Sequence, residues 1–75
     1  MMSNYINDDI KIKESVLHKL IRDCIKDLEK YDKEEDEINY IYALDNLDVT
    51  AKSYVIAGKI TEKDYHKLLQ KYGGE

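Results

Sequence analysis

The best candidates for a nucleophile or a general base in this 75-residue chain are Cys24, His18 and His66. Cys24 and His18 are separated by about 240° around a helix at about 100° per residue, so they do not face each other. Cys24 lies on an apolar helical stripe, where a cysteine serves as a small packing group with an unreactive thiol. His66 follows Tyr65 on the side of its helix that is expected to face solvent. We therefore predict no catalytic residue and no enzymatic activity.

Motifs for metal or cofactor binding are missing from the sequence. The chain has a single cysteine and two distant histidines, which do not make a paired metal-binding motif. The carboxylates of residues 32–37 lack the glycine and the regular spacing of a calcium loop. No glycine-rich loop precedes a helix, because Gly73 and Gly74 follow the last one. We therefore predict no cofactor and no metal.

The acidic residues are concentrated in the middle of the chain. Residues 31–50 carry seven acids and one base, within a protein of net charge −4. This band disfavours binding to a nucleic-acid backbone and favours a basic protein surface. The same carboxylates also suit a turn followed by the positive end of a helix dipole, and both interpretations can hold. The acidic patch comprises Asp32, Glu34, Glu35, Asp36 and Glu37.

The composition and the apolar periodicity predict an all-α fold. The chain has no proline and three glycines, and it is rich in Lys, Glu, Leu and Ile. We predict one domain over residues 1–75, a small three-helix bundle in which residues 1–8 are frayed or extended. Residues 14–31 form the first helix, capped by Asn7, Asp8, Asp9 or Ser15. Its apolar face consists of Leu17, Leu20, Ile21, Cys24, Leu28 and Tyr31.

The second helix, over residues 34–57, carries two apolar stripes, with a possible break near residues 46–48. The broad stripe holds Tyr40, Ile41, Leu44, Leu47, Ala51, Tyr54 and Val55, and the narrow one holds Ile38, Tyr42, Val49 and Ile56. Two stripes need two contact surfaces, so we predict a protein partner, either a second copy or another protein. Asp45, Asp48 and Lys52 lie in the gap, where they either bind that partner or form a solvated seam. The predicted partner-binding residues are Ile38, Tyr40, Tyr42, Asp45, Asp48, Val49 and Lys52.

A tight Gly-Lys-Ile-Thr turn, residues 58–61, joins the second and third helices. Gly58 suits the C-terminal cap of the second helix. Thr61 and Asp64 suit an N-terminal capping box for the third helix, and Ile60 and Tyr65 suit the hydrophobic staple beside it. Residues 57–69 resemble the SHOCT motif, a short helical hairpin, over about a third of the chain. Its matching positions are Gly58, Ile60, Thr61, Tyr65 and Leu69, and Asp64 replaces the usual Glu. The resemblance implies interaction or oligomerisation and no catalysis.

The leading hypothesis for function is a small protein–protein interaction module. An alternative is an acidic inhibitor that occupies a basic groove of a nucleic-acid-binding protein, of the DNA-mimic or anti-CRISPR type, since the sequence resembles accessory products of phages and mobile elements in style. A DNA-binding regulator is a second alternative, although the third helix starts with Glu62 and Asp64. No apolar run suits a membrane span or a signal peptide, and the lone thiol fits a reducing compartment, so we expect a cytoplasmic location.

Overall fold

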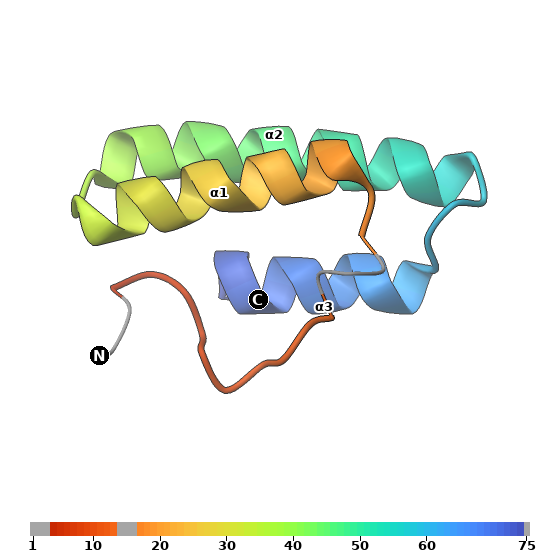
Figure 1. Cartoon of the computed structure of the whole chain (residues 1–75), viewed down its shortest axis with the longest axis horizontal. Helices are drawn as coiled ribbons and strands as arrows, with labels where there is room; N and C mark the ends of the chain where they lie inside the picture. The colour runs from red at the N-terminus through yellow and green to blue at the C-terminus, as the bar shows by residue number, and fades with distance from the viewer. Residues whose placement is uncertain (1–3, 14–16, 75) are drawn as a thin grey trace.

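The computed structural model describes residues 4–13 and 17–74, and these form three helices and no strand. Helices α1 (Lys19–Lys33) and α2 (Glu37–Ile56) lie side by side as an antiparallel hairpin, and α3 (Glu62–Gly73) returns beneath them (Figure 1). The non-helical N-terminal segment, residues 4–13, runs along α3 before the chain enters α1. The predicted all-α fold of a small three-helix bundle is confirmed.

The core lies between the three helices, and α2 packs against both α1 and α3. α1 contributes Ile21, Ile25 and Leu28 at positions i, i+4 and i+7, which lie on one side of a helix. This face differs from the predicted one, because Ile25 is fully buried and Leu20 is 58% exposed. The apolar residues of α1 span more than one face, and α2 together with α3 covers only part of them. Among the described residues, the buried apolar side chains are those of Leu17, Ile21, Ile25, Leu28, Tyr40, Ala43, Leu47, Ala51, Leu68 and Tyr72.

The first helix begins later than predicted. His18 occupies the N-cap position and makes no side-chain cap hydrogen bond; its ring stacks on Tyr54 with centroids 4.7 Å apart. The proposed caps Asn7, Asp8 and Asp9 are therefore wrong, because these residues belong to the N-terminal segment. Ser15 and the predicted start at residue 14 lie outside the described residues.

The second helix is continuous, so the suggested break near residues 46–48 is wrong. It starts at Glu37, three residues after the predicted start, because Glu35 adopts a left-handed φ of 55° that ends α1. The Asp36 side chain then caps α2 by accepting the Asn39 backbone N–H at 3.2 Å. The turn between α1 and α2 thus uses residues that the sequence analysis placed in the helix.

The turn before α3 matches its sequence prediction. Ala57 is the C-cap of α2, and the next residue, Gly58, has a φ of 74°. The Thr61 side chain caps α3 by accepting the Asp64 backbone N–H at 3.1 Å. Ile60 and Tyr65, the predicted staple residues, are both partly buried against the core.

Replacement of Gly58 by valine is expected to destabilise this turn. A Cβ at position 58 would meet nothing within 4 Å, so the cost comes from the positive φ and not from a clash. A β-branched residue resists this backbone conformation, and we expect Gly58→Val to lower the free energy of unfolding by about 1–3 kcal/mol. Urea denaturation followed by circular dichroism measures the loss. Gly58→Asn is the matched control with a smaller expected loss, because asparagine tolerates the left-handed region better; equal losses would contradict a conformational cause.

The N-terminal segment is non-helical and contains a turn in which the Ile10 N–H donates to the Asn7 carbonyl at 3.3 Å, so its residues 4–8 are neither frayed nor fully extended. The backbone N–H of Asn7 donates to the Lys71 carbonyl at 2.8 Å, and the Lys71 Nζ donates to the Ile10 carbonyl at 2.7 Å. At its start, the Tyr5 N–H donates to the Asp32 carboxylate at 2.5 Å. The Tyr5 ring also packs on Tyr40, with centroids 4.9 Å apart. This segment therefore connects the C-terminal part of α3 to the last turn of α1.

Candidate interaction surface

One side of α2 carries large apolar side chains that are exposed to solvent in the described part of the chain. Residues 38, 42, 45, 49, 52 and 56 recur at intervals of three and four, which places them within about 80° of one another on a helix. We call this set the outer stripe. Its apolar members have exposed fractions of 69% (Ile38), 68% (Tyr42), 66% (Val49) and 82% (Ile56), and the adjacent Ile41 is 50% exposed. The outer stripe lies opposite the buried side of α2, which contains Ala43, Leu47 and Ala51.

Two charged residues belong to the outer stripe. Asp45 and Lys52 are both exposed, and their positions on the helix place them among Tyr42, Val49 and Ile56. On the helix both fall between Ile41 of the broad stripe and the apolar members of the narrow stripe, which is the gap that the sequence predicts. The spacing of three and four residues also keeps them on the exposed side of α2.

Tyr40 does not belong to an accessible surface, so its assignment as a partner-binding residue is wrong. It is 4% exposed, and its hydroxyl donates to the Tyr72 carbonyl at 2.5 Å. Tyr40 lies on the side of α2 that holds Leu47 and Ala51. A tyrosine is readily buried when its hydroxyl has an acceptor, and the C-terminal turn of α3 provides one. Burial raises the pKa of Tyr40 above its ordinary value.

Asp48 is also used within the chain. It is half-buried on α2, and its carboxylate accepts a hydrogen bond from the Tyr65 hydroxyl of α3. This contact ties α2 to α3 and turns the Asp48 side chain away from the exposed stripe. Of the three polar residues predicted to bind a partner, Asp45 and Lys52 stay accessible and Asp48 does not fit that assignment.

The acidic patch divides into structural and exposed carboxylates. Asp32 is buried, accepts the Tyr5 N–H through its carboxylate and accepts the Asn4 side chain through its carbonyl, so its place in an exposed patch is wrong. Asp36 is half-buried, and its two carboxylate oxygens bind the backbone and the side chain of Asn39. The remaining members, Glu34, Glu35 and Glu37, are exposed at one end of the helical hairpin.

The candidate nucleophile and the two candidate bases each contact a different neighbouring residue. The Cys24 Sγ is half-buried and lies 4.0 Å from the Thr50 hydroxyl, and burial raises the pKa of this thiol. The His18 ring stacks on Tyr54, whereas the His66 ring packs on Tyr65 with centroids 5.4 Å apart. Within residues 4–13 and 17–74, no three His, Cys, Asp or Glu side chains are grouped in a way that could hold a metal ion.

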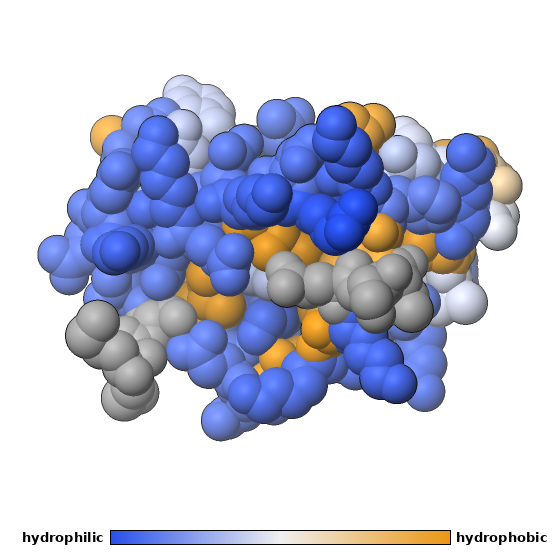
Figure 2. All heavy atoms as spheres, in the orientation of Figure 1, coloured by the Kyte–Doolittle hydropathy of each residue, from blue (hydrophilic) through white to orange (hydrophobic). Residues whose placement is uncertain are grey.

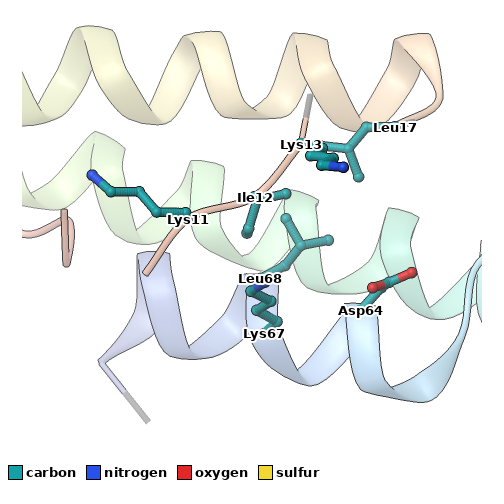
Figure 3. Close-up of a pocket in the computed structure, with 7 residues that line it drawn as sticks. All are labelled: Lys11, Ile12, Lys13, Leu17, Asp64, Lys67 and Leu68. Carbon is teal, nitrogen blue, oxygen red and sulfur yellow. The ribbon is translucent and has the colours of Figure 1, made fainter. Parts of the chain in front are cut away.

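A shallow hollow of about 370 Å³ lies between the N-terminal segment and α3. Figure 2 shows apolar atoms in the furrow between α1 and α3, and Figure 3 shows Ile12 and Leu68 on facing sides of this hollow. The polar groups at its border are Asp64 and the long side chains of Lys11, Lys13 and Lys67. Small-molecule sites combine an apolar pocket with polar groups that converge on the ligand. The side chains at the border of this hollow do not form such a convergent set. We assign no ligand to the hollow.

Replacement of Tyr40 by phenylalanine is expected to change the alkaline stability of the protein. The folded chain holds the Tyr40 proton more tightly than the unfolded chain, whose tyrosines titrate near about pH 10. The stabilisation from this difference is fully present below about pH 10 and is lost as the pH rises toward the folded-state pKa. We expect Tyr40→Phe to make the free energy of unfolding fall less steeply between about pH 10 and 12, and to cost about 1 kcal/mol at pH 7 because the Tyr72 carbonyl loses this donor.

Urea titrations at several pH values measure this effect, and Tyr42→Phe is the matched control because Tyr42 is 68% exposed. We expect the control to follow the wild-type profile. Superimposable profiles for the two variants would contradict the role of Tyr40 burial.

No helix in the described part of the chain is both long enough and apolar enough to cross a membrane. Comparisons with protein-family models, with curated proteins and with solved structures gave no match, so the likeness of residues 57–69 to the SHOCT motif remains a resemblance.

Proposed function

We propose that this chain is a small, non-enzymatic, cytoplasmic protein–protein interaction module that binds its partner through the outer stripe of α2. The exposure of Ile38, Tyr42, Val49 and Ile56 along one side of a single helix supports this proposal most directly. Single exposed apolar residues are normal on protein surfaces and need no explanation. These four lie along one side of a helix of 20 residues, which is about 30 Å long, with Asp45 and Lys52 between them.

The energetics of burial favour an interface of useful strength. Full burial of a valine, isoleucine or aromatic side chain stabilises by about 1.5–3 kcal/mol, and each of these four side chains is 66% or more exposed. The outer stripe therefore offers about 6 kcal/mol from one side of an interface. A partner with similar exposed apolar side chains would supply a comparable gain. The two gains together offset an association cost of about 4–15 kcal/mol.

The composition of the stripe also suits recognition of a protein. Tyrosine combines an apolar ring with a polar hydroxyl and is enriched in interfaces, and Tyr42 presents both to solvent. Asp45 and Lys52 supply charges of opposite sign among the apolar side chains. Charges at such positions set orientation and specificity more than affinity.

The two alternatives are less well supported. A basic-groove inhibitor needs a broad acidic face, and the burial of Asp32 and the capping role of Asp36 leave three exposed carboxylates at the end of the hairpin. A DNA-binding regulator needs a basic helix, and the Lys71 amino group on α3 is already bonded to the N-terminal segment. We therefore retain the interaction module as the proposed function.

Site-specific photocrosslinking in the cells that naturally produce the protein tests the proposal. A benzoylphenylalanine placed at Ile41, at the edge of the outer stripe, is expected to form a protein adduct of defined mass. The same group at Lys26, on the exposed side of α1, serves as the control and is expected to form none. No adduct from position 41, or the same adduct from both positions, would contradict the proposal.

A further inference from the structure

We infer that the partner of the outer stripe is a second copy of this chain, bound antiparallel along α2 about a two-fold axis at Val49. This inference rests on the proposed function and adds the identity of the partner. In a two-fold interface each contact occurs twice, because a residue pair i and j is repeated as j and i. A stripe that pairs with itself must therefore fit a second copy of the same stripe that runs in the opposite direction.

The apolar members of the outer stripe have this symmetry. Tyr42 lies seven residues before Val49, and Ile56 lies seven residues after it. In an antiparallel pair of helices with the axis at Val49, the two Val49 side chains meet and each Tyr42 lies against Ile56 of the second copy. A repeat of seven residues keeps these positions facing the partner along the whole contact. All three side chains are about two thirds or more exposed in the single chain.

The charges favour this antiparallel pairing over a parallel one. Asp45 lies four residues before Val49 and Lys52 three residues after it, so each Asp45 lies beside Lys52 of the second copy. Within one helix they are separated by about 10 Å along the axis, too far for a direct ion pair. A parallel pair would instead place Asp45 against Asp45 and Lys52 against Lys52. Like charges in contact disfavour an arrangement, so the stripe selects the antiparallel one.

A contact along one side of α2 makes a small interface. The outer stripe follows a single helix of about 30 Å, and a standard interface takes ~800 Å² per partner out of the 5417 Å² that this chain exposes. We therefore expect a dimer that dissociates in the micromolar range and exchanges its subunits.

Sedimentation equilibrium of the purified full chain from about 1 to 500 µM tests this inference. The expected result is a concentration-dependent rise from 8.8 kDa to twice that mass. Val49→Asp places two carboxylates together at the axis, and we expect it to raise the dimer dissociation constant at least tenfold without changing the helical content. Leu20→Asp is the matched control, since Leu20 is 58% exposed on α1, and we expect an unchanged dissociation constant.

A charge exchange tests the direction of the pairing. Asp45→Lys places a lysine beside Lys52 of the second copy, and the two-fold axis repeats this contact. Lys52→Asp likewise places a second carboxylate beside Asp45 of the other copy. We expect each single variant to weaken the dimer several-fold, more strongly at low salt, and the double variant D45K/K52D to restore it. A mixture of the two single variants is expected to form a heterodimer, because each charge then meets its opposite.

The results separate this inference from the proposed function. A strict monomer over the whole concentration range overturns the inference, and so does a dimer that neither Val49→Asp nor the charge exchange affects. A crosslinked adduct from position 41 that contains a different protein also overturns it, while the proposed interaction through the outer stripe remains supported. An adduct of two copies of this chain supports both.

Discussion

Leu28→Ala is expected to lower the free energy of unfolding by about 2–5 kcal/mol, the range for removing a buried leucine from a close-packed core. Leu28 has no exposed surface and lies among the buried residues that join α1 to α2 and α3. A chain of this length is stabilised by only about 4–11 kcal/mol in total. The substitution therefore removes a large share of the stability, and we expect the melting temperature to fall by more than about 10 °C.

Leu20→Ala is the matched control for this substitution. Leu20 lies on the same helix and undergoes the same change of residue, but it is 58% exposed. We expect a loss below about 1 kcal/mol, because most of the side chain already contacts water. Thermal and urea unfolding followed by circular dichroism give both values. Equal losses for the two variants would show that α1 presents a different face to the core.

The second large effect is expected at Asp32. Its buried carboxylate accepts the Tyr5 N–H, and this hydrogen bond holds the start of the N-terminal segment, which packs Ile6 and Ile12 against the core. A hydrogen bond to a charged group contributes about 1.5–3 kcal/mol. We expect Asp32→Ala to cost about 2–4 kcal/mol, because part of the apolar contact of the segment is lost with the bond.

Limited trypsin digestion detects the release of the segment directly. Cleavage after Lys11 and Lys13 is expected to become faster in Asp32→Ala than in the wild-type chain, since both lysines lie within the segment. Asp32→Asn is the control, because its side-chain carbonyl keeps an acceptor for the Tyr5 N–H, and we expect it to be cleaved at a rate closer to wild type. Unchanged cleavage in Asp32→Ala would show that the segment is held by its other contacts alone.

The parts of the fold that were predictable from sequence follow local rules. Gly58, Thr61 and Asp64 lie within seven positions of one another, and each acts through its own backbone conformation or a neighbouring N–H. The face of α1 that enters the core was less predictable. Its apolar residues extend around the helix, and the choice of Ile25 over Leu20 depends on where α2 and α3 lie. That placement is a property of the assembled chain.

The same distinction applies to the candidate surface. The spacing of Ile38, Tyr42 and Val49 on one helix was enough to predict a second stripe, and the structure leaves all three exposed. Tyr40 and Asp32 were misassigned because their partners are distant in sequence, 32 positions away for the Tyr72 carbonyl and 27 for the Tyr5 N–H. Nothing in the local pattern around either residue indicates that such a partner exists.

The hydrogen bond between Asn7 and Lys71 spans 64 positions of the chain and has a consequence for biosynthesis. The hairpin of α1 and α2 joins neighbouring segments and is able to form as soon as both have left the ribosome. Residues 4–13 are made before the helix on which they rest, and that helix follows about 3–13 s later at a translation rate of about 5–20 residues per second. This segment therefore reaches its final position only after α3 has been made, and until then its apolar residues are open to a chaperone.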